Sequence, residues 1–263
     1  MRTLKAILAY DGSGFVGWQR QRSGRSVQGE LERVCAEIEG RSVPIAGAGR
    51  TDAGVHALGQ VASFQLSHHI EPASLVRAFN AKLPPSIRVI DVRQVDDGFH
   101  ARFSAHEKTY RYYISSSAVG SPFTRMHVWH VGRALDLESI QAAGQVFVGK
   151  HDFAAFQAAG AKVKSTVRNI YRVGVSIIES TSGIAPDTGT PLVAVEVVGD
   201  GFLRHMVRIM VGTLVGVGSG RMPAESVSKV ITSRRRELAG VTAPARGLFL
   251  VSVRYTRGLT QNG

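Results

Sequence analysis

The chain has 263 residues, 44% of them hydrophobic and 20% charged, which is enough for one large core or two smaller ones. Its 32 Lys and Arg residues outnumber its 20 Asp and Glu residues and leave a formal net charge of +12. Such a surplus attracts polyanions and favours a nucleic-acid partner. The single cysteine, Cys35, excludes an intrachain disulfide and a zinc site built from cysteines.

Two features of the hydrophobic pattern argue against export and membrane insertion. The apolar run near the N-terminus ends at Tyr10, too early for the core of a secretory signal. The longest apolar stretch, Ile209–Gly218, has about half the length that crosses a bilayer. We therefore expect a cytoplasmic protein, and a lone thiol is consistent with that compartment.

The first half of the chain predicts the element order β-α-β-β-α-β. Its first helix has the clearest pattern, because Val27, Leu31, Val34 and Ile38 recur at helical spacing until Gly40 stops them. The expected elements are the strand Leu4–Tyr10, the helix from Ser26 to Gly40, the strands Val43–Ala48 and Leu58–Leu66, a helix after Pro72, and the strand Arg88–Val95.

The second half repeats that order, with one additional helix. The expected elements are the strand Thr109–Ser115, the helix Asp136–Val148, the strands Val167–Ile178 and Pro191–Gly199, the helix Phe202–Val217, the additional helix Ala224–Arg236, and the strand Gly247–Tyr255. This order predicts an α+β protein of two tandem ferredoxin-like (RRM-like) units, 1–104 and 105–263. Their sheets should be largely antiparallel, with helices on one face and the other face free to line a cleft.

The glycine-rich loop Gly47–Gly54 stands out as a candidate site. It lacks the Gly-Lys-Ser/Thr of a phosphate-binding loop, and Asp52 occupies the place of the third glycine in a dinucleotide fingerprint. What remains is a tight loop that presents the carboxylate of Asp52 beside the cation Arg50. An Asp in such a loop is more often an Asx-turn residue than a catalyst, so the loop alone leaves both readings open.

The expected helix Phe202–Val217 is apolar nearly all round and should be buried. Arg204 and Arg208 nevertheless lie four residues apart on it. A buried guanidinium needs an anion, because an unpaired buried charge costs several kcal/mol. Asp52 is one possible partner, and Glu196 and Asp200, which are nearer in sequence, are the others. A pairing of Arg208 with Asp52 would keep that carboxylate ionised.

Aromatic residues among cations suggest contacts with unpaired bases. In the strand that carries Tyr110, Arg111 and Tyr112, the two tyrosines share one face, as in base-stacking platforms. A core tyrosine is an equally good interpretation of each ring. Aromatic and basic residues also alternate in Phe99–Phe103. The remaining basic stretches, such as the one with Lys162 and Lys164, are also consistent with ordinary solvated faces, and no histidine pattern indicates a metal site.

Ordered motifs over nearly the whole chain resemble the tRNA pseudouridine synthase A (TruA) family. The most specific is Gly49-Arg-Thr-Asp-Ala-Gly-Val-His56. The others are Tyr10-Asp-Gly, Gly17-Trp-Gln-Arg-Gln21, Ser26-Val-Gln28, Gly59-Gln-Val61, Phe99-His-Ala-Arg-Phe-Ser104, Tyr110-Arg-Tyr112, His205-Met-Val-Arg208 and Gly247-Leu-Phe-Leu-Val251.

The resemblance implies a cytoplasmic homodimer without cofactor or metal. Such an enzyme converts uridine to pseudouridine in the anticodon stem-loop, at positions 38 to 40 of the tRNA, in a cleft between the two units. By the same match, Asp52 is the essential aspartate and Tyr110 lies against the target uracil. Arg208 is the basic partner of the aspartate, and Leu250 belongs to a hydrophobic wall.

The resemblance also implies which residues contact RNA. These are Arg50 and the segment Phe99, His100, Ala101, Arg102 and Phe103. Lys162 and Lys164 occupy the place of a further RNA-contacting segment. Two other classes of protein remain as alternatives from the residues alone: a non-catalytic RNA-binding module of two RRM-like units, and an enzyme with a phosphate-binding loop.

Overall fold

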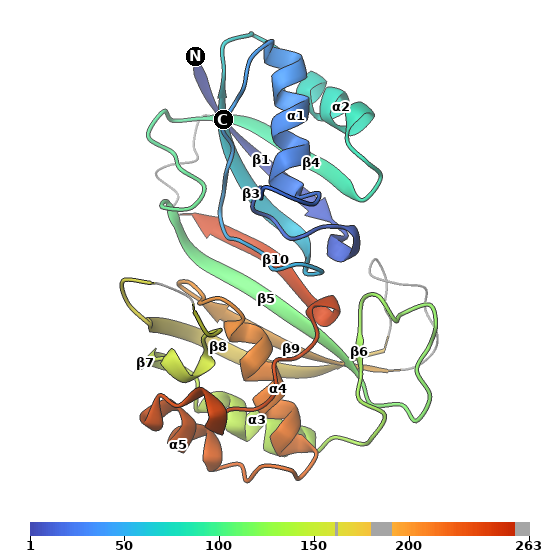
Figure 1. Ribbon diagram of the computed structural model, residues 1–263, viewed down its shortest axis with the longest axis vertical. Coiled ribbons are helices and arrows are strands. Elements are labelled where there is room, and N and C mark those ends of the chain that lie inside the picture. Colours follow the sequence, from blue (N-terminus) through green and yellow to red (C-terminus); the bar gives the residue numbers. More distant parts are fainter. Residues whose placement is uncertain (161–162, 180–190, 256–263) are drawn as a thin grey trace. The chain divides into compact units, whose positions relative to one another are not determined.

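The computed structural model describes residues 1–160, 163–179 and 191–255 (Figure 1). By their contacts these residues form two units, the first made of 1–108 with 249–255 and the second of the described part of 109–248. Lys162, the expected loop 180–190 and the tail after Tyr255 lie outside the described residues. The mixture of helices and sheet confirms the α+β class. No described helix is long and apolar enough to span a membrane.

The first unit is a sheet with the strand order β4-β1-β3-β10, and β2 pairs with β3. Its elements are β1 (Arg2–Tyr10), α1 (Val27–Glu39), β2 (Ala46–Gly47), β3 (His56–Leu66), α2 (Pro72–Lys82), β4 (Ile87–Val95) and β10 (Leu248–Tyr255). β1 is antiparallel to both β3 and β4. β10 is parallel to β3, with Leu250 opposite Ala57.

Helices α1 and α2 lie side by side on one face of this sheet (Figure 1). The Ser26 side chain caps α1 by accepting a hydrogen bond from Gly29 N–H. Gly40 ends the helix with a φ of 72°, a left-handed conformation that suits glycine. The apolar side of α1 is buried, as the spacing of Val27, Leu31 and Val34 predicts.

The other face of the sheet carries a small apolar cluster made by the segment after β4. Phe99 and Ala101 are buried there against Ala48 and Val61. Tyr255 packs on Phe99, with ring centroids 4.9 Å apart, and its hydroxyl donates to Ala101 O at 2.8 Å. This packing fixes the backbone of the Phe99–Phe103 segment on the sheet.

The second unit contains the strand order β5-β9-β8-β7, with β6 beside β5. Its elements are β5 (Ala105–Ser115), β6 (Trp129–His130), α3 (Leu137–Gln145), β7 (Gly149–Asp152), β8 (Val167–Ile178), β9 (Leu192–Gly199), α4 (Met206–Gly218) and α5 (Ser226–Ser233). The first four residues of β5 belong to the first unit. β8 is antiparallel to both β7 and β9, and α3 packs against α4 and β8.

Three of the expected elements differ clearly in the structure, and the short strands β6 and β7 were not expected. The expected strand Val43–Ala48 is only the two residues of β2, because Pro44 lacks an N–H donor and the carbonyl of Ile45 accepts from Gln28. The last strand, β10, neighbours β3, so by contacts it belongs with the first unit rather than with 105–263. Helix α4 begins at Met206, four residues after the expected start.

Candidate active site

Asp52 lies half-buried in the connection between β2 and β3. Its carbonyl oxygen accepts a hydrogen bond from Val55 N–H at 3.1 Å, which closes a tight turn around the side chain. The carbonyl of the preceding residue, Thr51, accepts from Trp18 N–H at 3.0 Å. The backbone is therefore held at Asp52 and at the residue before it.

A glycine-containing segment after β1 packs directly on this loop. Gly17 has a φ of +109°, and a Cβ atom there would lie 2.6 Å from Thr51 O. At Gly12, a Cβ atom would lie 2.0 Å from Val55 O. Both positions therefore require glycine, because any side chain would push the Asp52 loop away. The glycines of the motifs Tyr10-Asp-Gly and Gly17-Trp therefore allow the backbone after β1 to pack closely against the Asp52 loop.

Thr51 of the loop and two side chains from the strands, Tyr10 and Gln60, are buried and polar. The Tyr10 hydroxyl is 2.8 Å from Thr51 Oγ1. Gln60 Nε2 donates to Gly49 O at 2.9 Å and to the Tyr10 hydroxyl at 3.3 Å. Burial raises the pKa of Tyr10 to about 12, although its hydrogen bonds with Thr51 and Gln60 act in the opposite direction. The phenol is therefore neutral at physiological pH.

Arg50 is exposed but held by a chain of amides that the sequence alone did not reveal. Its Nε donates to Gln19 Oε1 at 2.9 Å. Gln19 Nε2 donates to Gln28 Oε1 at 2.5 Å. Gln28, in turn, donates to Glu32 Oε1 at 3.0 Å and to Ile45 O at 2.9 Å. The guanidinium of Arg50 is thus oriented by hydrogen bonds that lead back to α1. In the sequence, this chain of amides was indicated only by the presence of Gln19 and Gln28 in the motifs of the resemblance.

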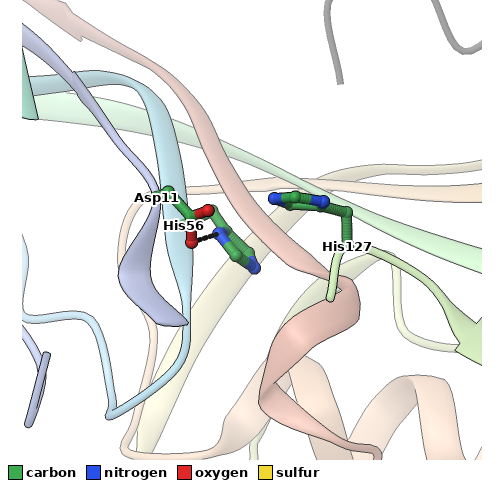
Figure 2. A group of neighbouring side chains, drawn as sticks. All are labelled: Asp11, His56 and His127. Carbon is green, nitrogen blue, oxygen red and sulfur yellow. Dashed lines mark ion pairs between the residues drawn. The ribbon is translucent and has the colours of Figure 1, made fainter. Parts of the chain in front are cut away.

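Asp11 and His56 form a polar pair elsewhere in the first unit (Figure 2). His56 Nδ1 lies 3.2 Å from Asp11 Oδ1 and 3.1 Å from the backbone nitrogen of Gly12. One ring nitrogen cannot donate to the carboxylate while it accepts the Gly12 N–H. The two contacts therefore belong to different tautomers of the ring. His127, also drawn in Figure 2, belongs to the second unit.

The Asp11–His56 pair does not amount to a metal site within the first unit. Structural zinc sites use four protein ligands, and catalytic ones three. The pair supplies two ligand atoms, and Asp11 Oδ1 already accepts from Ser13 N–H at 2.9 Å as the cap of a short helix. The Asp11–His56 pair connects the turn after β1 to the start of β3.

In the second unit, Tyr110 and Tyr112 share the buried face of β5. The Tyr110 ring meets Phe202 edge-on. The Tyr112 hydroxyl donates to Pro244 O at 2.6 Å. Burial raises the pKa of Tyr112, against the opposing effect of the nearby Arg208 and Arg246 charges. Tyr112 is thus a core tyrosine.

Helix α4 is buried, as the apolar pattern predicted, except at Arg208, which is half-buried rather than buried as expected. Arg208 Nε donates to Ala243 O at 2.8 Å, and its carbonyl accepts from Ala243 N–H at 3.1 Å. The expected strip of two arginines on the helix was wrong, because Arg204 precedes α4 and is exposed. His205, with a φ of 63°, takes a left-handed conformation that prevents the helix from starting earlier.

The chain matches a known protein family over most of its length. A family model described as tRNA pseudouridine synthase matches residues 6–104 and 143–256. The chain belongs to the tRNA pseudouridine synthase family. The match contains the Asp52 loop, Arg208 and Leu250, whereas Tyr110 lies in the segment between the two matched ranges.

Three relatives that match nearly the whole length of this pseudouridine synthase are 43–44% identical to it. tRNA pseudouridine synthase A of Acetivibrio thermocellus is 43% identical over 97% of this chain and 100% of its own. The proteins of the same name from Limosilactobacillus fermentum and Syntrophotalea carbinolica are 44% identical over 97% of this chain, and over 96% and 97% of their own. A chain of the archaeal box H/ACA sRNP Nop10-Cbf5 complex matches 81% of this chain and 44% of its own length at 14% identity, with a TM-score of 0.32.

The remaining candidate residues of the synthase divide into buried and exposed groups. Phe99 and Ala101 are buried, and so is Leu250 on β10. Arg102 and Phe103 are exposed, with the guanidinium 5.5 Å from the ring centroid and the ring 76% accessible. The His100 ring lies 4.4 Å from that of Phe103, and its Nδ1 accepts from Arg102 N–H at 3.1 Å. Lys164 is also exposed. In the Phe99–Phe103 segment, the buried side chains of Phe99 and Ala101 therefore anchor the exposed side chains of Arg102 and Phe103.

Proposed function

We propose that this chain converts uridine to pseudouridine in the anticodon stem-loop of tRNA, at positions 38 to 40, with Asp52 as its catalytic carboxylate. The observation that carries the assignment is the half-buried Asp52 in a turn whose backbone is tied on both sides. A catalytic group must be held in place before the substrate arrives. A relative that is 43% identical over 97% of the chain bears the name tRNA pseudouridine synthase A.

The reaction breaks the bond between C1′ of the ribose and N1 of the uracil, turns the base, and forms a bond from C1′ to C5. The proton on C5 is lost to a base, and N1 gains a proton, so no oxidant, metal or nucleotide is required. An ionised Asp52 has three routes open to it: attack on C1′ to give a glycosyl ester, removal of the C2′ proton to give a glycal, or attack on uracil C6.

The other side chains follow from the same proposal. Arg208 is the counter-ion that keeps Asp52 ionised, and Tyr110 stacks against the uracil while it is detached. Leu250 lines the apolar wall of the site. The two ferredoxin-like units enclose the catalytic cleft between them, and the enzyme works as a cytoplasmic homodimer.

The target uridine must leave its stack, which costs a few kcal/mol. Contacts of the basic surface with phosphates supply binding energy without reading the sequence. We assign such contacts to Arg50, Arg102, Lys162 and Lys164. His100 and Phe103 make further contacts with the RNA, and Phe99 and Ala101 are the buried support of their segment. The Gln19 and Gln28 amides hold Arg50 in a fixed direction for this task.

The test is to incubate the purified protein with unmodified tRNA and to map new pseudouridines. We expect them only within the anticodon stem-loop. Pseudouridine elsewhere in the tRNA would contradict the site, and none at all would favour the alternative of a non-catalytic RNA-binding module. Family membership argues against that module and against a phosphate-loop enzyme.

A further inference from the structure

Three buried side chains close to Asp52 have no part in the chemistry described above. Tyr10, Thr51 and Gln60 are 4%, 6% and 0% exposed, and all three end in polar atoms. An apolar core would hold the same volume without the cost of burying hydroxyl and amide groups. The fold retains them, and the hydrogen bonds between them lead to the residue that directly precedes Asp52.

We propose that the Thr51 hydroxyl, held by Tyr10 and Gln60, is a positioning group that sets the direction of the Asp52 carboxylate. The inference rests on the proposed catalytic role of Asp52. Tyr10, Thr51 and Gln60 act through Asp52 and touch no substrate themselves.

The geometry supports this role because three hydrogen bonds hold the loop, one at Gly49 and two at Thr51. Gln60 Nε2 fixes Gly49 O, and Tyr10 fixes the Thr51 side chain at 2.8 Å. Trp18 N–H fixes the Thr51 carbonyl. With its side chain and its carbonyl both bound, Thr51 has little freedom in φ and ψ, and these angles orient the following Cα–Cβ bond, that of Asp52.

Directional bonds suit this task better than apolar packing does. A hydrogen bond restricts both the distance and the angle between its partners, and it strengthens in a low-dielectric interior. Tyr10 lies on β1 and Gln60 on β3, two strands paired along their length, so the anchor is rigid. A misplacement of about 1 Å at a reacting group can cost about 100-fold in rate.

The experiment compares Thr51→Val, which keeps the shape of the side chain but loses the hydroxyl, with Thr51→Ser, which keeps the hydroxyl. Tyr10→Phe removes the same hydrogen bond from its other end. The readout is release of tritium from C5-labelled uridine in tRNA, in a single turnover with saturating enzyme. The dissociation constant for tRNA and the melting temperature are measured for each variant.

Thr3→Val is the matched control. Thr3 lies on the same strand as Tyr10 and is 3% exposed, and its hydroxyl also has two side-chain partners, Asp97 and Gln65. Its place at the other end of β1, about 23 Å away at 3.3 Å per residue, separates a general loss of stability from an effect on Asp52. We expect a lower melting temperature and an unchanged single-turnover rate.

For Thr51→Val and Tyr10→Phe we expect single-turnover rates lower by roughly 10- to 100-fold, with tRNA affinity within about 3-fold of wild type. Thr51→Ser should recover most of the rate. The double variant should lose no more than Tyr10→Phe alone, because Tyr10→Phe already removes the Tyr10–Thr51 hydrogen bond together with the one from Gln60. If Thr51→Val does not fold, Tyr10→Phe alone decides. Wild-type rates in a folded Thr51→Val or Tyr10→Phe variant, or equal losses in Thr51→Ser and Thr51→Val, would overturn the proposal.

Asp52→Asn is run in parallel so that two failures can be told apart. Full turnover in Asp52→Asn overturns the catalytic assignment and the positioning role with it. An inactive Asp52→Asn beside a fully active Thr51→Val overturns the positioning role alone.

Discussion

The ring of Tyr110 meets the ring of Phe202 edge-on, with centroids 5.0 Å apart and planes at 81°. Such a pair contributes roughly 0.5–1.5 kcal/mol beyond the burial of area. The contact holds the Tyr110 ring in one orientation from outside β5, since Phe202 precedes α4. A base that stacks on Tyr110 would therefore meet a ring that is already oriented.

Replacing Tyr110 by Ala removes this oriented ring. We expect turnover to fall by about 100-fold or more, with the dissociation constant for tRNA within about 3-fold of wild type. Tyr110→Phe is the control for stability, because it keeps the ring and the contact with Phe202. Steady-state kinetics and a binding titration check the prediction, and a loss confined to affinity would reassign Tyr110 to docking.

Arg208→Met tests a side chain with a structural and a proposed electrostatic role. The change leaves the buried carbonyl of Ala243 without the Nε donor. We expect a loss of about 1.5–3 kcal/mol in the free energy of unfolding, the range for hydrogen bonds to a charged group, and strongly reduced turnover. Arg208→Lys keeps the charge but not the planar fork, so it should recover part of the turnover. Wild-type turnover in Arg208→Met would show that Asp52 has another partner.

Arg102→Gln tests the contact of the Phe99–Phe103 segment with RNA. Its guanidinium is exposed, so the fold should tolerate the change. A phosphate contact predicts weaker tRNA binding and a decrease of about 1 in the slope of log K against log salt. Arg33→Gln, on the exposed side of α1 beside Glu37, is the matched control and should leave the slope unchanged. Equal slopes for both variants would remove Arg102 from the RNA interface.

Glu39 gives a prediction about pH and stability. Its side chain is 1% exposed. Burial alone would raise the pKa of its carboxyl, but hydrogen bonds from Ser67 and from His68 N–H outweigh burial and lower that pKa to about 2. Since the folded pKa lies below the unfolded value near 4.5, the stabilisation is complete above pH 4.5 and is lost as the pH falls towards 2.

We therefore expect Glu39→Gln to lower the free energy of unfolding by about 1–3 kcal/mol at pH 7. The difference from wild type should shrink between pH 4.5 and 2. Urea denaturation at several pH values measures it. A difference that does not change with pH would mean that the charge of Glu39 contributes nothing.

Local patterns in the sequence predicted several elements well, because neighbouring residues determine them. Ser26 and Gly40 mark the ends of α1 as helix caps. The continuous apolar sequence of α4 predicted a buried helix. The start of α4 could not be predicted in the same way, because it depends on the left-handed backbone of His205.

The sequence predicted the part of the candidate site that lies within the motif around Asp52. The Asp52 loop was recognisable from its glycines and from one carboxylate. The support beneath it was not, because the Tyr10–Thr51 hydrogen bond joins residues 41 positions apart. Alternation along β1 predicts a core position for Tyr10, but it cannot name the partner of its hydroxyl. Such pairs appear only when the register of β1 and β3 is known.

The most direct test of the account is tritium release by Asp52→Asn from tRNA labelled at uridine C5. Asn has nearly the shape of Asp but cannot be ionised, so it cannot attack C1′ or remove a proton. The account predicts that the variant folds and binds tRNA like wild type while it releases no tritium above background. Turnover near the wild-type rate in the purified variant would contradict the central role of the Asp52 carboxylate.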